Sequence, residues 1–151
     1  MTILAVTRQG DAAAVPHPIL LFSQQFAIRW DDMDALEHVN NAQYLSYFTE
    51  SRVAWAEQCG LRLQRDGVGM ILAKASVSYR KPVEYPAQVV VNLYPGKIGR
   101  TSFTMINTLT VAGDSEPAAT GEFVLVWFDY ANKKPALVPD SLRAILTGGG
   151  D

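Results

Sequence analysis

Apolar and polar residues alternate along several short stretches of the chain. The first stretch runs from residue 25 to residue 30, and its Phe26, Ile28 and Trp30 share one face. A period of two is typical of a strand that buries one of its two faces. The pattern therefore predicts a strand over Gln25–Trp30 with these three side chains in the core.

A helical period follows the polar segment Asp31–Asn41. Residues that recur at spacings of three and four would form one stripe along a helix: Tyr44, Phe48, Ser51, Trp55 and Cys59. Asn40 and Gln43 are suited to cap the start of this helix as a variant of the capping box. Gly60 is suited to a left-handed cap at its end. We therefore predict one long helix that ends before Gly60.

Strand-like patterns return after this helix. They predict four more strands: Ile71–Tyr79, Gln88–Tyr94, Thr101–Val111 and Ala118–Tyr130. Turn formers such as those of Pro95–Gly99 favour hairpins between the strands, and Ser141–Leu146 reads as a short final helix. One strand, a long helix and then four strands indicate an α+β domain. Its antiparallel five-stranded sheet would wrap around the apolar stripe of the central helix.

Length and composition are those of one globular domain. The chain has 151 residues, of which 48% are hydrophobic and 19% are charged. We expect a flexible N-terminal tail at residues 1–19 and a folded domain at residues 20–147. The net charge of −2 gives no general attraction for nucleic acid or anionic membranes. The sequence also lacks an apolar span and a secretory signal, so we expect a cytoplasmic protein.

The residues that several kinds of catalytic or cofactor site require are absent from this sequence. One cysteine and two histidines cannot make a four-ligand Cys/His zinc site, and no metal or cofactor is indicated. No G-x-S-x-G, G-x-G-x-x-G or Walker-type loop occurs. Nucleophile-elbow hydrolases, dinucleotide-binding enzymes and NTPases are therefore not supported.

The segment Asp31–Asn41 places four carboxylates and His38 between a strand and a helix start. Backbone N–H groups at a helix start, here that of Asn41, can hold a developing oxyanion. A carboxylate just upstream can attack an acyl carbonyl or deprotonate a water. The same carboxylates could simply favour the helix dipole, and His38 could be structural. Residue types alone leave both interpretations open.

The run Arg29–Tyr44 resembles the signature of the hot-dog acyl-CoA thioesterases, in the branch related to hydroxybenzoyl-CoA thioesterase. That signature is roughly aromatic-x-D-x-D-x-x-G-H-V-N-N-x-x-Y before the central helix. Tyr79–Pro82 and Gly96–Phe103 are similar to the family's second-strand end and later hairpin. The resemblance covers about residues 22–130. It implies a hot-dog fold and hydrolysis of an acyl-CoA to a free carboxylic acid and coenzyme A.

The resemblance also implies roles for individual residues. Asp34 takes the position of the catalytic carboxylate, as nucleophile or general base, and the N–H of Asn41 polarises the thioester carbonyl. His38 and Asn40 match positions that shape the loop. Glu37 stands where the family usually has glycine, so a positive φ there would suit it poorly and could rearrange the loop.

Substrate-binding residues are expected among basic and apolar side chains. The phosphates of coenzyme A would need basic groups at the entrance; the candidates are Arg80, Lys81, Lys97 and Arg100. For each, a solvated surface charge is the alternative. An acyl pocket could use Tyr47, Phe48 and Val77, although aromatic residues on a helix stripe also suit a plain core.

Two other functions remain open at this point. A hot-dog hydratase or dehydratase would pair Asp34 with His38, but Ala35–Glu37 stands where the hydratase motif has Asn-Pro. A non-catalytic acyl-CoA-binding module would use Asp34 only as a cap. In each case we expect a homodimer or homotetramer, because sheet edges need protection and hot-dog relatives pair their sheets.

Overall fold

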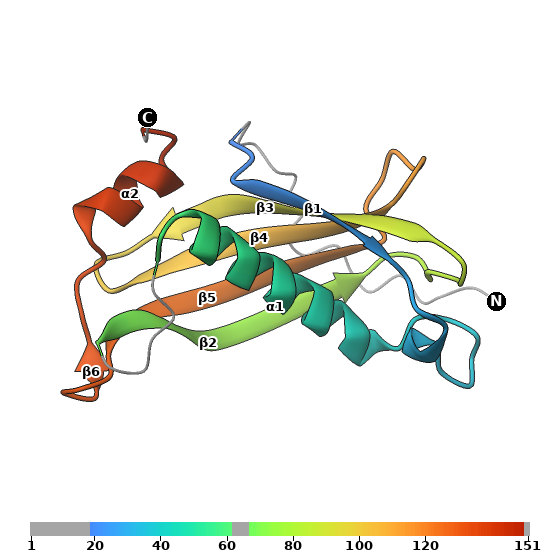
Figure 1. Cartoon of the computed structure of the whole chain (residues 1–151), viewed down its shortest axis with the longest axis horizontal. Helices are drawn as coiled ribbons and strands as arrows, with labels where there is room; N and C mark the ends of the chain where they lie inside the picture. Colours follow the sequence, from blue (N-terminus) through green and yellow to red (C-terminus); the bar gives the residue numbers. More distant parts are fainter. Residues whose placement is uncertain (1–18, 62–66, 150–151) are drawn as a thin grey trace, which may run out of the picture.

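In the computed structural model, a curved antiparallel sheet lies behind one long helix (Figure 1). The structure describes residues 19–61 and 67–149. The strands are β1 (Phe22–Ala27), β2 (Val68–Tyr79), β3 (Gln88–Ile98), β4 (Ser102–Val111), β5 (Ala119–Asp129) and β6 (Lys134–Pro135). The helices are α1 (Asn41–Gln58) and α2 (Asp140–Leu146), and the 3-10 turn η2 covers Trp30–Asp32. Apart from Ile19, the predicted tail at residues 1–19 lies outside the described residues.

The order of the strands in the sheet is β1-β3-β4-β5-β2, and every neighbouring pair is antiparallel. This confirms the predicted α+β architecture of the hot-dog fold. The two-residue strand β6 adds to the five predicted strands by pairing with the end of β5. β2 is an edge strand, because its only partner within the described residues is β5.

The core lies between α1 and the concave face of the sheet. The helix buries Tyr44, Phe48, Ser51 and Trp55, as its stripe predicted, while Cys59 is the C-cap residue. The Phe48 ring lies 5.5 Å from the ring of Phe123 on β5. Each fully buried side chain of this size stabilises the fold by about 1.5–3 kcal/mol. Neither helix in the described ranges is long and apolar enough to cross a membrane.

The first strand differs from its prediction. It begins at Phe22 and ends at Ala27 rather than running from Gln25 to Trp30. Ile28 is buried as predicted, but Trp30 is 75% exposed, so its expected place in the core was wrong. The reason is a turn: the Asp32 carboxylate accepts a hydrogen bond from the Arg29 N–H at 3.0 Å. The chain leaves the sheet there, and alternation no longer directs side chains inward.

Local capping fixes both ends of α1. The Asn40 side chain accepts a hydrogen bond from the Ala42 N–H at 2.9 Å, which confirms Asn40 as the N-cap. Gln43 does not complete the capping box, since the Asn40 N–H donates to the carbonyl oxygen of Asp32 instead. At the other end Gly60 has a φ of +70°, and the Leu61 N–H donates to the Ala56 carbonyl at 2.9 Å. This is a Schellman motif, which stops the helix where predicted.

Candidate active site

The polar segment between η2 and α1 forms a closed loop. Met33 and Val39 form an antiparallel bridge at its base. Inside it, the Asp34 N–H donates to the His38 carbonyl and the Glu37 N–H donates to the Asp34 carbonyl, both at 3.0 Å. Glu37 has a φ of +62°, so it adopts the left-handed conformation that a glycine would adopt freely. The loop therefore closes despite Glu37, and the strain is on the order of 1–2 kcal/mol.

Asp34 sits at the turn of this loop, and one of its carboxylate oxygens is held. Its Oδ1 accepts a hydrogen bond from the Leu36 N–H at 2.9 Å. Its Oδ2 has no hydrogen-bond partner among the described residues, and the side chain is only half-buried. One oxygen is thus oriented by the backbone while the other can act on a water or an acyl carbon.

The start of α1 supplies a donor. The Asn40 side chain occupies the Ala42 N–H, whereas within residues 19–61 and 67–149 the Asn41 N–H has no acceptor. The Asn41 carbonyl oxygen accepts the hydroxyl hydrogen of Tyr79, the last residue of β2, at 2.8 Å. Asn41 is therefore held through its carbonyl, and its N–H remains available at the positive end of the helix dipole.

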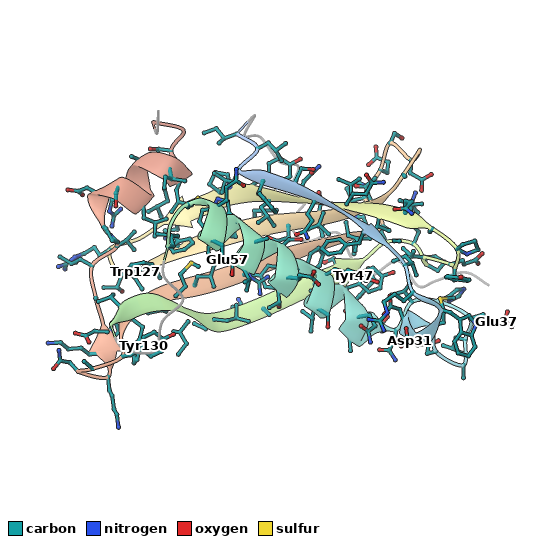
Figure 2. The ribbon with its side chains drawn as sticks, viewed as in Figure 1. Asp31, Glu37, Tyr47, Glu57, Trp127 and Tyr130 are labelled. Carbon is teal, nitrogen blue, oxygen red and sulfur yellow. The ribbon has the colours of Figure 1, made fainter. Side chains whose placement is uncertain are left out.

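Asp34 lines a hollow that carries negative charge and exposed apolar side chains. Around it lie Trp30, Asp31, Met33, Leu36, Glu37, His38, Glu84 and Tyr85. Asp31, in η2, and Glu37, in the loop, both lie at the end of the molecule where α1 starts (Figure 2). The only basic group of this lining is His38, whose Nε2 is 3.7 Å from Glu84 Oε1. Phosphate groups would be repelled from this hollow.

A second hollow, on the Asn41 side, is basic. It is lined by His38, Val39, Asn41, Tyr44, Tyr79, Arg80, Lys81 and Pro82. The Lys81 Nζ is 2.6 Å from Asp114 Oδ2, so the charge of Lys81 is already compensated. Arg80 has no carboxylate partner among the described residues. His38 borders both hollows, and the candidate carboxylate and the candidate N–H donor therefore face adjoining spaces.

Two predicted binding residues lie far from this loop. Lys97 and Arg100 belong to the β3–β4 hairpin, beside α2, where the Arg143 Nη2 donates to the Arg100 carbonyl at 3.2 Å. Gln88, at the site end of β3, is nine residues from Lys97, which corresponds to about 30 Å at about 3.3 Å per residue. In one chain, this separation places both residues at the end of the sheet opposite the Asp34 loop.

Of the three residues predicted for an acyl pocket, Tyr47 and Phe48 are buried in the core, and Val77 packs against it partly buried. Tyr47 is 8% exposed, and its ring lies 4.9 Å from that of Phe26 on β1. Its hydroxyl donates to Asp32 Oδ2. Phe48 is fully buried against Phe123. Neither Tyr47 nor Phe48 lines either hollow.

Two residues of the site were missed by sequence reasoning. Asp32 is 7% exposed and joins the loop to the helix through Tyr47, and Tyr79 joins β2 to Asn41. Burial raises the pKa of Tyr79. Burial, together with the hydrogen bond to Asp32, raises the pKa of Tyr47. Both phenols therefore stay protonated and donate hydrogen bonds at neutral pH. The usable signals were Asp32 in the D-x-D pattern and Tyr79 at the last inward position of its strand.

Among the described residues, no group of three or more His, Cys, Asp and Glu side chains gathers as a metal site. The groups available for catalysis are the Asp34 carboxylate, the Asn41 N–H at the start of α1 and the His38 imidazole. A carboxylate with an oxyanion donor is sufficient for acyl transfer from an activated acyl group.

Comparison with known proteins agrees with this chemistry. The family model of the thioesterase-like superfamily matches residues 28–146. The search of curated proteins gave no match. Among solved structures, the PA2801 protein of Pseudomonas aeruginosa, provisionally assigned as a thioesterase, is 38% identical with a TM-score of 0.79. The alignment covers 83% of this chain and 98% of that protein.

Two further solved structures are each 29% identical in sequence to this chain. The PA5185 protein of Pseudomonas aeruginosa has a TM-score of 0.78, with 85% of this chain and 91% of that one covered. A thioesterase from Thermus thermophilus, solved with coenzyme A and Zn, has a TM-score of 0.73, with 85% and 94% covered. The family match spans most of the chain and includes the whole Asp34 loop. The chain therefore belongs to the thioesterase-like superfamily and is a thioesterase of the hot-dog fold.

Proposed function

We propose that this thioesterase hydrolyses the thioester bond of an acyl-coenzyme A and that Asp34 is its nucleophile or general base. One observation carries the proposal. Among the described residues, one carboxylate oxygen of Asp34 and the N–H of Asn41 have no partner. Asp34 directly follows Met33, and Asn41 follows Val39 by two residues, so the Met33–Val39 bridge brings the two segments together. A thioester carbon needs both groups at once, because the attack and the developing oxyanion occur at the same carbonyl.

In the general-base route, Asp34 takes a proton from water, and the resulting hydroxide attacks the thioester carbon. The oxyanion forms against the Asn41 N–H. Its collapse breaks the C–S bond, releases the carboxylic acid and expels the coenzyme A thiolate, which takes the proton from Asp34 and so restores the carboxylate. In the nucleophilic route, Asp34 attacks the thioester carbon, the C–S bond breaks and coenzyme A leaves as the thiolate. Water then cleaves the mixed anhydride to the free carboxylic acid and the Asp34 carboxyl group, whose proton passes to the thiolate. The geometry supports either route, since Asp34 Oδ2 has no other partner among the described residues.

The charges of the two hollows suggest how coenzyme A is oriented. Arg80 is the uncompensated cation of the basic hollow, as far as the described residues extend, while the hollow around Asp34 carries three further carboxylates. Phosphates would therefore lie on the Arg80 side. The Thermus relative was solved with coenzyme A, which supports a ligand of this class.

We also propose that the thioesterase works at least as a homodimer that pairs β2 with β2 across a two-fold axis. β2 is 12 residues long, most of its residues are exposed, and Ile71 and Leu72 are exposed apolar side chains. A long, exposed edge strand with apolar side chains favours pairing with a strand of another chain. Antiparallel pairing would place the partner's Val68 end beside Tyr79. The partner's Lys97 and the partner's Arg100 lie at that end of its sheet, separated from its β2 by β5 and, for Lys97, by β4 as well. Those two predicted residues could then serve the site only from the partner subunit.

The test is thiol release from a panel of acyl-CoAs by the wild type, Asp34→Asn and Asp31→Asn. Asparagine retains an oxygen that can accept the Leu36 N–H, so the loop should survive while turnover falls about 100-fold or more. Asp31 is the matched control, because it is an exposed carboxylate of the same segment whose contact is with Arg29 at 3.3 Å. Asp31→Asn should stay near the wild-type rate.

Three results would contradict the proposal. Near-wild-type turnover by Asp34→Asn would make the carboxylate structural. Tight acyl-CoA binding without turnover in the wild type would indicate a binding module. Enoyl-CoA hydration without thiol release would indicate a hydratase.

A further inference from the structure

Asp32 connects three separate parts of the chain around the candidate site. Its Oδ2 accepts the N–H of Arg29, which lies two residues after the end of β1, at 3.0 Å. The same oxygen also accepts the hydroxyl hydrogen of Tyr47, in the second turn of α1. Its carbonyl oxygen accepts the Asn40 N–H at 2.9 Å. A buried carboxylate that satisfies several donors resists displacement, because any movement leaves polar groups unpaired in a poorly solvated place.

Both candidate catalytic groups depend on this anchor. Asp34 follows Asp32 by two residues. The N–H of Asn41 lies in the peptide plane that begins at Asn40, whose backbone is set at φ −58° and ψ 137°. Because the Asn40 N–H is held by the Asp32 carbonyl, the position of Asp32 fixes where that peptide plane stands. The Tyr47 hydroxyl ties the same residue to the body of the helix.

We propose that Asp32 and Tyr47 are positioning residues of the thioesterase. Their hydrogen bond holds the Asp34 loop in register with the first turn of α1, so that the Asp34 carboxylate and the Asn41 N–H meet the same carbonyl. This inference rests on the proposed function. Neither residue touches the substrate, so the effect of their loss falls on turnover. A misplacement of about 1 Å in such a pair can cost up to about 100-fold in rate.

Tyr79 holds the opposite side of the same turn. Its hydroxyl donates to the Asn41 carbonyl, and its ring packs edge-on against Tyr44 with centroids 5.0 Å apart. Tyr79 is also 44% exposed and lines the basic hollow, so its removal would change binding and positioning together. Tyr47 lines neither hollow, which makes it the cleaner residue to change.

The decisive variant is Tyr47→Phe, which retains the ring against Phe26 and removes only the hydroxyl. We expect kcat to fall about tenfold while KM for the best acyl-CoA stays within about twofold of wild type. The control is Thr147→Val, which removes a hydroxyl that donates to the Arg143 carbonyl at 2.8 Å at the end of α2. Figure 1 shows α2 at the end of the molecule away from the loop that precedes α1, and away from the β2 edge. Thr147→Val should leave kcat unchanged.

A second variant protects the test against poor folding of the first. Asp32→Asn replaces the charged oxygen that accepts both hydrogen bonds by a neutral amide oxygen, which accepts more weakly. It should therefore show the same selective loss of kcat, smaller than that of Asp34→Asn. If Tyr47→Phe and Asp32→Asn lower only the melting temperature and keep the wild-type kcat, the positioning role is wrong. The proposed function stands in that case as long as Asp34→Asn is inactive. If Asp34→Asn is active, the proposed function is wrong, and this inference, which rests on it, is wrong as well.

Discussion

Tyr79 donates its hydroxyl hydrogen to the carbonyl oxygen of Asn41 at 2.8 Å, although the two residues are 38 positions apart in the chain. The contact joins the last residue of β2 to the first residue of α1. It leaves the Asn41 N–H unoccupied and holds the residue that carries it. A donor that is fixed before the substrate arrives needs little reorganisation in the transition state, which is the condition for effective oxyanion stabilisation.

The oxyanion role of Asn41 can be tested by removing its N–H. Asn41→Pro deletes this donor at the first helical position, where proline is well tolerated. Asn40 already has the extended conformation that a residue before proline adopts. We expect a folded protein whose kcat is lower by about 100-fold. The control is Asn41→Ala, which keeps the N–H and should keep the activity. Equal activity of the proline and alanine variants would exclude the role.

The strained backbone of Glu37 predicts a stabilising substitution. At a φ of +62°, glycine removes a strain of about 1–2 kcal/mol but adds freedom to the unfolded chain worth about 0.4–1 kcal/mol. Glu37→Gly should therefore raise the free energy of unfolding by about 0.5 kcal/mol, measured by urea denaturation. Glu37→Ala keeps the strain and should show no such gain. If alanine stabilises as much as glycine, the benefit comes from removing the charge.

Arg80 and Lys81 should differ in their effects on substrate binding. Lys81 is paired with Asp114 at 2.6 Å, while Arg80 lines the basic hollow without a carboxylate partner among the described residues. Arg80→Ala should raise KM for acyl-CoA about tenfold, as expected for a lost charge-assisted hydrogen bond. Lys81→Ala should raise it less. A thioester of N-acetylcysteamine carries no phosphates, so Arg80→Ala should leave its hydrolysis unchanged. If Arg80→Ala impairs the hydrolysis of both substrates equally, Arg80 does not bind the phosphates of coenzyme A.

Trp55 provides a test of how α1 packs. It is 1% exposed and lies on the buried stripe, so Trp55→Ala should lower the free energy of unfolding by about 3–5 kcal/mol. Val53, on the outer face of the same helix and 39% exposed, is the control, and Val53→Ala should cost much less. A loss below about 1 kcal/mol for Trp55→Ala would contradict the observed helix phase.

The β2 edge predicts the assembly state. Light scattering at micromolar concentration should give twice the mass of the chain or more. Ile71 is 40% exposed on this edge, and Ile71→Lys introduces a charge that disfavours edge pairing. This variant should shift the protein toward monomer and reduce turnover. A wild-type protein that is monomeric and fully active would rule out a shared site.

Local rules predicted the parts of this molecule that depend on near neighbours. The stripe of α1, the Asn40 cap and the Gly60 end follow from spacing and capping within a few residues. The distance between Lys97 and Asp34 depends on which end of which strand each hairpin occupies, and periodicity carries no such information. The contact between Tyr47 and Asp32 arises only when the helix packs against β1. Trp30 fitted the strand pattern, but a hydrogen bond from Arg29 to Asp32 ends the strand before it.

The exposure of Trp30 has a practical consequence for measurement. The chain has three tryptophans; Trp55 and Trp127 are 1% and 8% exposed, whereas Trp30 is 75% exposed at the rim of the Asp34 hollow. Its indole should emit at longer wavelength than the other two and should be the one that acrylamide quenches readily. Ligand occupancy of the hollow would then be visible as protection of this single fluorophore. Trp30 is thus an intrinsic fluorescent probe of the hollow, and Trp30→Phe would remove its signal without changing the core.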